Sequence, residues 1–138
     1  MFSHGARPGF IIGAMVLAAG FSVFPAHQAL ASARSCAGIS RPFDVCVSVN
    51  GSGRHINSIQ GSLHNAGTGT QRHVHIELSG PHGVIKNCAA TTIGPLQTIY
   101  CTWSPHANEP AGKYCATGWQ FASGQYHNVG EPCVDVHN

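Results

Sequence analysis

The chain has 138 residues, of which only 9% are charged, and its formal net charge is +2 at pH 7. It contains no basic run and no block of like charges, and such clusters are the electrostatic footprint of nucleic-acid binding. We therefore expect no nucleic-acid partner.

The first part of the chain has the layout of a secretory signal peptide. The apolar run 9–24 is followed by small residues around Ala31 and Ala33. This run is shorter than the roughly 20 residues of a membrane-spanning helix, and an uncleaved signal anchor is the alternative. We predict a signal peptide over residues 1–31 and a secreted, extracellular, monomeric domain over residues 32–138, with cleavage after Ala33 as the other possibility. No membrane attachment is expected after cleavage.

Beyond the signal peptide, short runs of β-branched and alternating residues are separated by Gly, Pro and Asn, and no helical period is sustained. A turn is expected at 50–53 and loops at 65–70 and 104–112, whereas residues 126–131 are expected to form either a short strand or a long loop. The pattern predicts an all-β fold, an antiparallel immunoglobulin-like β-sandwich with a small barrel as the alternative. Its seven or eight short strands include 43–49, 55–64, 71–79, 84–89, 96–103, 113–121 and 132–137.

The segment RHVHIEL, residues 72–78, has the alternation of a half-buried strand. The apolar residues Val74, Ile76 and Leu78 then face the core. The polar residues of the opposite parity, His73, His75 and Glu77, form the outer face. We predict a solvated histidine face on this strand.

A metal site is the alternative interpretation of the same histidines. His73 and His75 lie two residues apart on one face, about 7 Å apart at Cα, so both could bind one Zn or Cu ion. A closed site needs a third ligand from another strand. The candidates for this ligand are His55, His64, His82, His127 and His137. We expect no cofactor, with Zn or Cu as the alternative.

All six cysteines lie in the predicted mature domain. An even number in a short exported chain indicates a disulfide framework. No Cys-x-x-Cys pair is present, so a zinc ribbon or a redox motif is not indicated.

The positions of turn residues suggest which cysteines pair. Residues that face each other across an antiparallel hairpin are symmetric in number about its turn. Sequential pairing places the midpoints beside Pro42, between Gly94 and Pro95, and at Gly124, all of which favour turns. Gly and Pro are frequent here, so such midpoints also arise by chance and other pairings stay open. We predict the bridges Cys36–Cys46, Cys88–Cys101 and Cys115–Cys133.

The segment PAGKYC, residues 110–115, resembles the tyrosine corner of immunoglobulin-like sandwiches, in which a Tyr enters a late strand shortly before a cysteine. It departs from that pattern because Cys115 follows Tyr114 directly. Together, VNGSG, PAGKYCATGW and GEPCVDVH resemble segments of small secreted disulfide-rich β-sandwich proteins of actinobacteria. That resemblance implies secretion and a fold, but no activity.

No nucleophile-elbow, zinc-protease or phosphate-loop motif occurs in the sequence. Asp135 and His137 fall on one face of a strand, where a carboxylate could orient an imidazole, although two solvated residues explain the pair equally well. Bridged cysteines offer no thiol nucleophile. We expect a protein that is not an enzyme, with a small hydrolase as the alternative.

A binding surface is expected between Cys115 and Cys133. We predict that the domain recognises an extracellular protein or a cell-wall glycan, because aromatic side chains on a braced segment suit recognition. Trp119 and Phe121 share one face and could instead fill the core, which is the favoured position for Trp119. Tyr126 and His127 are then the better surface candidates. A protease inhibitor acting through the loop 105–110 is a further alternative.

Overall fold

Residues 32–138 form two packed antiparallel β-sheets in this computed structural model, which describes that part of the chain. The predicted signal peptide 1–31 lies outside the described residues. The described part contains eleven strands and no helix, which confirms the predicted all-β antiparallel sandwich. The seven or eight strands expected are too few, because the short strands β1, β6 and β8 were not predicted. Sheet A consists of β1 (Ala33–Ala37), β2 (Phe43–Ser52), β3 (His55–Asn65), β7 (Thr98–Trp103) and β8 (Ala107–Asn108). Sheet B consists of β4 (Gln71–Gly80), β5 (Gly83–Asn87), β6 (Thr91–Ile93), β9 (Gly112–Ala122), β10 (Gln125–Gly130) and β11 (Cys133–Val136).

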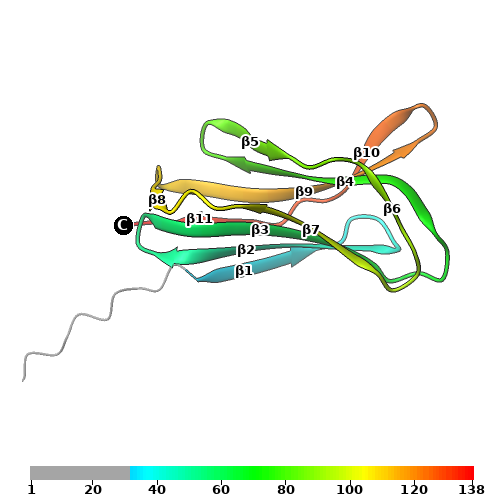
Figure 1. Cartoon of the computed structure of the whole chain (residues 1–138), viewed down its shortest axis with the longest axis horizontal. Coiled ribbons are helices and arrows are strands. Elements are labelled where there is room, and N and C mark those ends of the chain that lie inside the picture. The colour runs from blue at the N-terminus through cyan, green and yellow to red at the C-terminus, as the bar shows by residue number, and fades with distance from the viewer. Residues whose placement is uncertain (1–31) are drawn as a thin grey trace, which may run out of the picture.

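The two sheets lie as layers in Figure 1, with sheet A below and sheet B above. In sheet A the strand order is β1-β2-β3-β7, and the short strand β8 also pairs with β3. In sheet B the order is β10-β9-β4-β5, with β11 beside β9 and β6 beside β4. No helix among the described residues is long and apolar enough to cross a membrane.

Alternating side chains of β2 and β4 build the core between the sheets. Val45 and Val47 of β2 are fully buried. Val74 and Leu78 of β4 are also fully buried, as the alternation of that strand predicted. The inner face of β3 carries Gly61, which lies against side chains of sheet B. A Cβ on Gly61 would lie 2.7 Å from Ile76 Cγ2, so a side chain there would force the layers apart.

The hydrogen bond that is typical of a tyrosine corner is present. The Tyr114 hydroxyl donates to the backbone carbonyl of Pro110 at 2.8 Å, four residues upstream, while the ring is buried in the core. Burial raises the pKa of Tyr114, and Glu109 adds to this shift, so the phenol keeps the proton that it donates. The bond fixes the entry into β9, the central strand of sheet B.

Two of the three predicted disulfides join directly opposed residues. Cys36 faces Cys46 across β1 and β2, and their Cα atoms are 4.0 Å apart. Cys115 faces Cys133 across β9 and β11, and their Cα atoms are 4.1 Å apart. The chain between β9 and β10 turns at Ser123 and Gly124, as the midpoint at Gly124 predicted.

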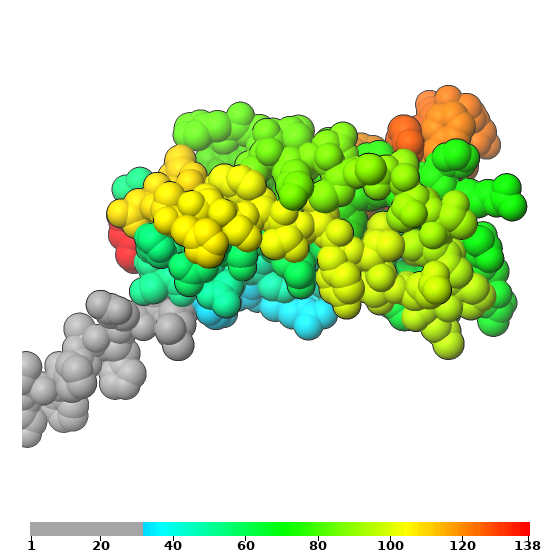
Figure 2. Space-filling model, in the orientation of Figure 1, coloured from blue at the N-terminus to red at the C-terminus, as the bar shows by residue number. Residues whose placement is uncertain are grey.

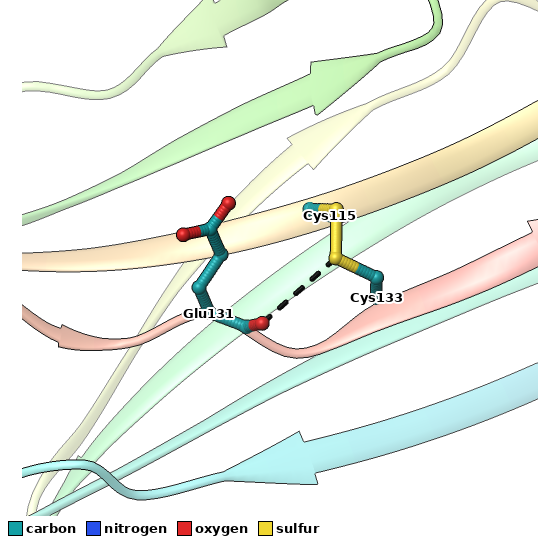
Figure 3. Close-up of side chains that lie close together, drawn as sticks. All are labelled: Cys115, Glu131 and Cys133. Atoms are coloured by element: carbon teal, nitrogen blue, oxygen red, sulfur yellow. Dashed lines mark hydrogen bonds between the residues drawn. A yellow bond between two sulfur atoms is a disulfide. The ribbon is translucent and has the colours of Figure 1, made fainter.

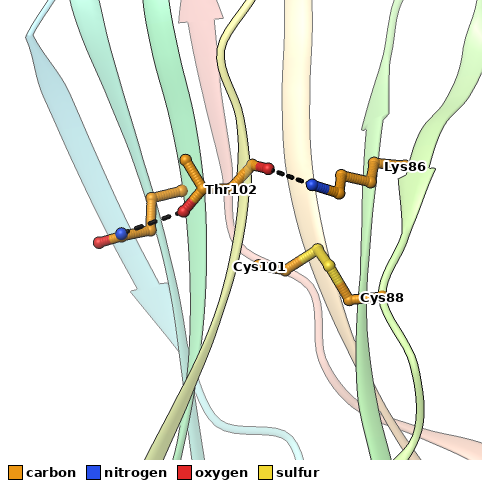
Figure 4. The surroundings of a disulfide bond; sticks show 5 residues. Lys86, Cys88, Cys101 and Thr102 are labelled. Carbon is orange, nitrogen blue, oxygen red and sulfur yellow. Dashed lines mark hydrogen bonds between the residues drawn. A yellow bond between two sulfur atoms is a disulfide. The ribbon is translucent and has the colours of Figure 1, made fainter.

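The third predicted bridge forms, but it is not the hairpin pair that the midpoint suggested. Cys101 lies on β7 of sheet A, and Cys88 follows β5 of sheet B, so this disulfide joins the two sheets. Beside it, Lys86 donates a hydrogen bond to the backbone carbonyl of Thr102 at 2.6 Å (Figure 4). The connection at Gly94 does not make a hairpin, because β6 turns back to pair with β4 while β7 pairs with β3.

Several expected boundaries and loops differ from the structure. The turn predicted at 50–53 begins later, because β2 continues through a bulge to Ser52. The expected loop 104–112 contains β8, which pairs with the start of β3. Arg54 Nε also donates to the Glu109 carbonyl at 2.9 Å, and the Glu109 N–H donates to the Arg54 carbonyl. The alternatives left for 126–131 resolve to a strand, β10.

Candidate functional site

The outer face of sheet B gathers a continuous group of aromatic rings. His73 and His75 come from β4, Trp119 and Phe121 from β9, and Tyr126 from β10. His75 faces Trp119 across β4 and β9, and Phe121 faces Tyr126 across β9 and β10. We call these five side chains the aromatic face.

Each ring of the aromatic face contacts the next. The His75 ring lies 6.5 Å from Trp119 at an interplanar angle of 23°, and 4.7 Å from Tyr126 in an edge-to-face arrangement. Phe121 and Tyr126 pack edge to face with centroids 5.2 Å apart, and His73 lies 6.2 Å from Phe121. A pair of the Phe121–Tyr126 kind contributes about 0.5–1.5 kcal/mol beyond its area burial. The rings therefore support one another in a fixed arrangement.

The favoured prediction that Trp119 fills the core is wrong. Trp119 is half-buried on the outer face, and Phe121 and Tyr126 are 43% and 44% exposed. The parity of β9 decides this, because Ala116 and Gly118 take the inner positions. The inner side at Gly118 has no room, since a Cβ there would lie 2.7 Å from a Val45 methyl group. The prediction that Trp119 and Phe121 share one face holds, as their common cluster shows.

The expected solvated histidine face is wrong for His75. This residue is only 9% exposed, because Trp119 of β9 and Tyr126 of β10 lie against its ring. Burial lowers the pKa of the His75 imidazole, and the nearby Glu77 carboxylate opposes the shift only in part. His75 is therefore neutral near pH 7 and belongs to the aromatic face as a ring rather than as a charge.

Two nitrogens within the aromatic face have no hydrogen-bond partner among residues 32–138. His75 Nδ1 and Trp119 Nε1 are both buried and unpaired. An unsatisfied buried polar group costs about 1–3 kcal/mol. This arrangement is thus less stable than a fully apolar or fully hydrogen-bonded one. Such a loss of stability is more typical of a functional site than of a structural core.

His73, at one end of the aromatic face, has an unusual backbone conformation. Its φ angle is +51°, a left-handed conformation that is uncommon outside glycine, and the pairing of β4 with β6 shifts between Gln71 and Val74. A bulge of this kind re-aims a side chain relative to regular alternation. Gln120 Nε2 donates to Gln71 Oε1 at 2.7 Å and holds β9 to this irregular stretch.

The hairpin formed by β9 and β10 carries the exposed end of the aromatic face. Its tip extends beyond the body at one end of the molecule, coloured orange in Figures 1 and 2. His127 faces Gln120 rather than Phe121, and its Nε2 contacts the Ala122 carbonyl at 3.0 Å. His127 is exposed but lies on the other side of the hairpin, so it does not join the aromatic face.

A shallow recess of about 350 Å³ borders the aromatic face at the junction with β5. The inter-sheet bridge forms part of its wall, and Tyr126 stands at its rim. The residues that line it are His75, Asn87, Cys88, Ala89, Ala90 and Tyr126.

The structure does not assemble the donors expected for a metal site. Within residues 32–138, the one cluster of three His, Cys, Asp or Glu donors consists of Cys115, Glu131 and Cys133 (Figure 3). Its two sulfurs are bonded to each other and are not thiolate ligands. None of the other histidines in that range forms such a cluster with His73 and His75.

The remaining sequence candidates lie away from the aromatic face. Asp135 is exposed on β11, and His137 follows the end of that strand, also exposed. The segment 105–110 is held to β3 through β8 rather than projecting as a free loop. The sequence pattern therefore indicated all five members of the aromatic face in two separate hypotheses, two histidines in one and three aromatic residues in the other, but not that they form one surface. The shared outer parity of 73–77 and 119–121 was the available signal.

Comparison with protein-family models, with curated proteins and with solved structures gave no match. A proposal for the function of this protein therefore rests on the geometry of the aromatic face.

Proposed function

We propose that this domain is exported and acts outside the cell as a non-enzymatic recognition domain whose aromatic face contacts a partner. The observation that carries the proposal is the position of Trp119, Phe121 and Tyr126 on the outside of sheet B and not in the core, since large aromatic side chains contribute most where a core or an interface buries them. Export is supported by three disulfides with no free cysteine among the described residues, which favour an oxidising compartment. It is also supported by the resemblance to small secreted proteins of actinobacteria.

The aromatic face has the physical properties of a contact surface. Phe121 and Tyr126 expose adjoining rings at the tip of a hairpin, and exposed aromatic pairs of this kind commonly mark interaction sites. The disulfide Cys115–Cys133 fixes the base of the hairpin. Little conformational entropy is therefore lost when a partner orders these rings.

A protein partner fits the ring geometry better than a glycan. The planes of Phe121 and Tyr126 meet at 67°, so the two exposed rings do not form a common flat platform for a sugar. Angled rings instead suit insertion between the side chains of a protein surface, where aromatic residues often dominate the binding energy.

The test compares wild-type protein, secreted from the full-length chain, with the double variant Phe121→Ala/Tyr126→Ala. Each protein is immobilised and exposed to the extracellular protein fraction and to the insoluble cell wall of the producing cells. Tyr100→Ala is the matched control for capture of a protein, because Tyr100 is an exposed tyrosine on the outer face of the other sheet. Near-UV circular dichroism checks that each variant is folded.

We expect a defined protein to bind wild type and Tyr100→Ala equally and to be lost from the double variant. Equal capture by all three proteins refutes the assignment of the aromatic face. Loss of cell-wall binding alone in the double variant replaces the protein partner with a glycan. If the double variant is misfolded, Tyr126→Ala alone is used in its place.

A further inference from the structure

The outer face of sheet A carries a separate hollow of about 490 Å³ that spans four strands. It is lined from β1 by Arg34, from β2 by Asp44 and Ser48, from β3 by Ser62 and His64, and from β7 by Tyr100. This face is turned away from sheet B and from the aromatic face, because the inner positions of β2 and β3 hold the core valines and leucine.

The register of the strands explains why this face is hollow. Ser62 in β3 lies between Cys46 in β2 and Tyr100 in β7, and Ser48 in β2 lies between Arg34 and Gln60. Short side chains thus lie at the centre of the two middle strands, and the longer side chains of Asp44, Gln60 and His64 on the same strands stand around them. The result is a polar floor with taller walls.

The chemistry of the hollow suits an uncharged ligand rich in hydroxyl groups. One cation, Arg34, and one anion, Asp44, balance each other, and the other polar lining groups are hydroxyl, amide and imidazole groups. A charged ligand of either sign would be repelled by one of these two residues and attracted by the other. Tyr100 is 62% exposed and supplies a ring against which the apolar face of a sugar can pack.

Hydrogen bonds and disulfides hold the strands and part of the lining of the hollow in place without a ligand. His64 Nδ1 hydrogen-bonds to Thr98 Oγ1 at 2.9 Å, and Gln60 Nε2 donates to Thr102 Oγ1 at 3.2 Å. One disulfide fastens β1 to β2, and the Cys88–Cys101 bridge (Figure 4) ties β7 to sheet B at the residue that follows Tyr100 in the chain. A rigid site of this kind loses little entropy on binding.

We propose that this hollow is a binding site for a neutral oligosaccharide. Tyr100 lies against one sugar ring, and Arg34, Asp44 and Gln60 hydrogen-bond to ring hydroxyls across the strands. The site goes beyond the recognition role of the aromatic face, since it uses a different sheet and different residues. The domain then has one face for a glycan and another for a protein.

The test titrates isotopically labelled protein, secreted from the full-length chain, with soluble neutral oligosaccharides of glucose, xylose or N-acetylglucosamine at millimolar concentrations. Chemical shifts are followed by NMR, with an oligogalacturonate as the anionic comparison. The variants are Tyr100→Ala, Tyr100→Phe and the aromatic-face variant Phe121→Ala/Tyr126→Ala. Tyr100 is exposed, so its replacement leaves the core intact.

We expect one neutral series to shift resonances of β1, β2, β3 and β7, with affinity reduced about tenfold or more by Tyr100→Ala. Tyr100→Phe keeps the ring and is expected to retain binding within about threefold, and the aromatic-face variant is expected to bind as wild type. The proposal is overturned if no neutral oligosaccharide shifts these resonances, if the anionic oligomer binds better, or if Tyr100→Ala binds as wild type. Loss of binding in the aromatic-face variant alone moves the glycan to sheet B and leaves the hollow without a role.

Discussion

Replacing Gly61 by Ala tests whether the two sheets approach each other as closely as the structure shows. The added Cβ would lie 2.7 Å from Ile76 Cγ2, 2.9 Å from the Ala116 Cβ and 3.0 Å from Leu78 Cδ2. Non-bonded carbons prefer separations of about 3.5–4.0 Å. The layers must therefore move apart by a large part of an ångström, or three well-packed side chains must leave their positions.

The expected cost follows from these contacts. Overpacking of a close-packed core destabilises proteins by about 1–3 kcal/mol. The loss of glycine entropy in the unfolded chain returns about 0.4–1 kcal/mol. We expect a net loss of about 1–2 kcal/mol in the free energy of unfolding, and a melting temperature lower by about 4–8 °C for each kcal/mol in a domain of this size.

Thermal and urea unfolding of the secreted protein measure this effect, and Gly69→Ala is the matched control. Gly69 is exposed, and a Cβ on it would meet only the Gln71 amide, at 3.9 Å. Gly69→Ala is expected to change the stability by less than about 0.5 kcal/mol. A melting temperature for Gly61→Ala equal to or above that of wild type and Gly69→Ala refutes the close approach of the sheets at this position.

The other predictions concern pH, the inter-sheet bridge and export. Because the pKa of His75 is lowered in the folded state, its imidazole is protonated at a higher pH in the unfolded chain than in the folded protein. The free energy of unfolding therefore decreases as the pH falls below the unfolded-state pKa of about 6.5. We expect His75→Phe to remove this part of the loss between pH 7 and pH 5 in urea unfolding, and parallel pH profiles of variant and wild type would contradict it. Cys88→Ser/Cys101→Ser is expected to cost about 2–4 kcal/mol in urea unfolding, since the bridge joins the sheets, and an unchanged urea midpoint would show that the Lys86 contact suffices. The intact mass of the secreted protein is expected to match residues 32–138 or 34–138 less the six hydrogens that three disulfides remove, and a mass that includes residues 1–31 would argue against cleavage.

The alternation of side chains in the sequence was sufficient to predict the core face of single strands. Val45 and Val47, like Val74 and Leu78, lie inside because a strand places alternate residues on opposite faces whatever surrounds it. The bridges Cys36–Cys46 and Cys115–Cys133 followed from the same local geometry, since each joins opposed residues of paired strands. The tyrosine corner was also readable, because its hydrogen bond spans only four residues.

Only the tertiary structure decided what covers the outer face of each strand. His75 was placed correctly on the outside by alternation, yet it is buried, because Trp119 and Tyr126 reach it from strands that lie more than 40 residues further along the chain. The same limit applies to Cys88–Cys101, where the pair was predicted but its role in joining the sheets was not. Local patterns determine which way a side chain points. The register between distant strands determines its neighbours, and that register depends on packing of the whole sandwich, which no short segment of the sequence encodes.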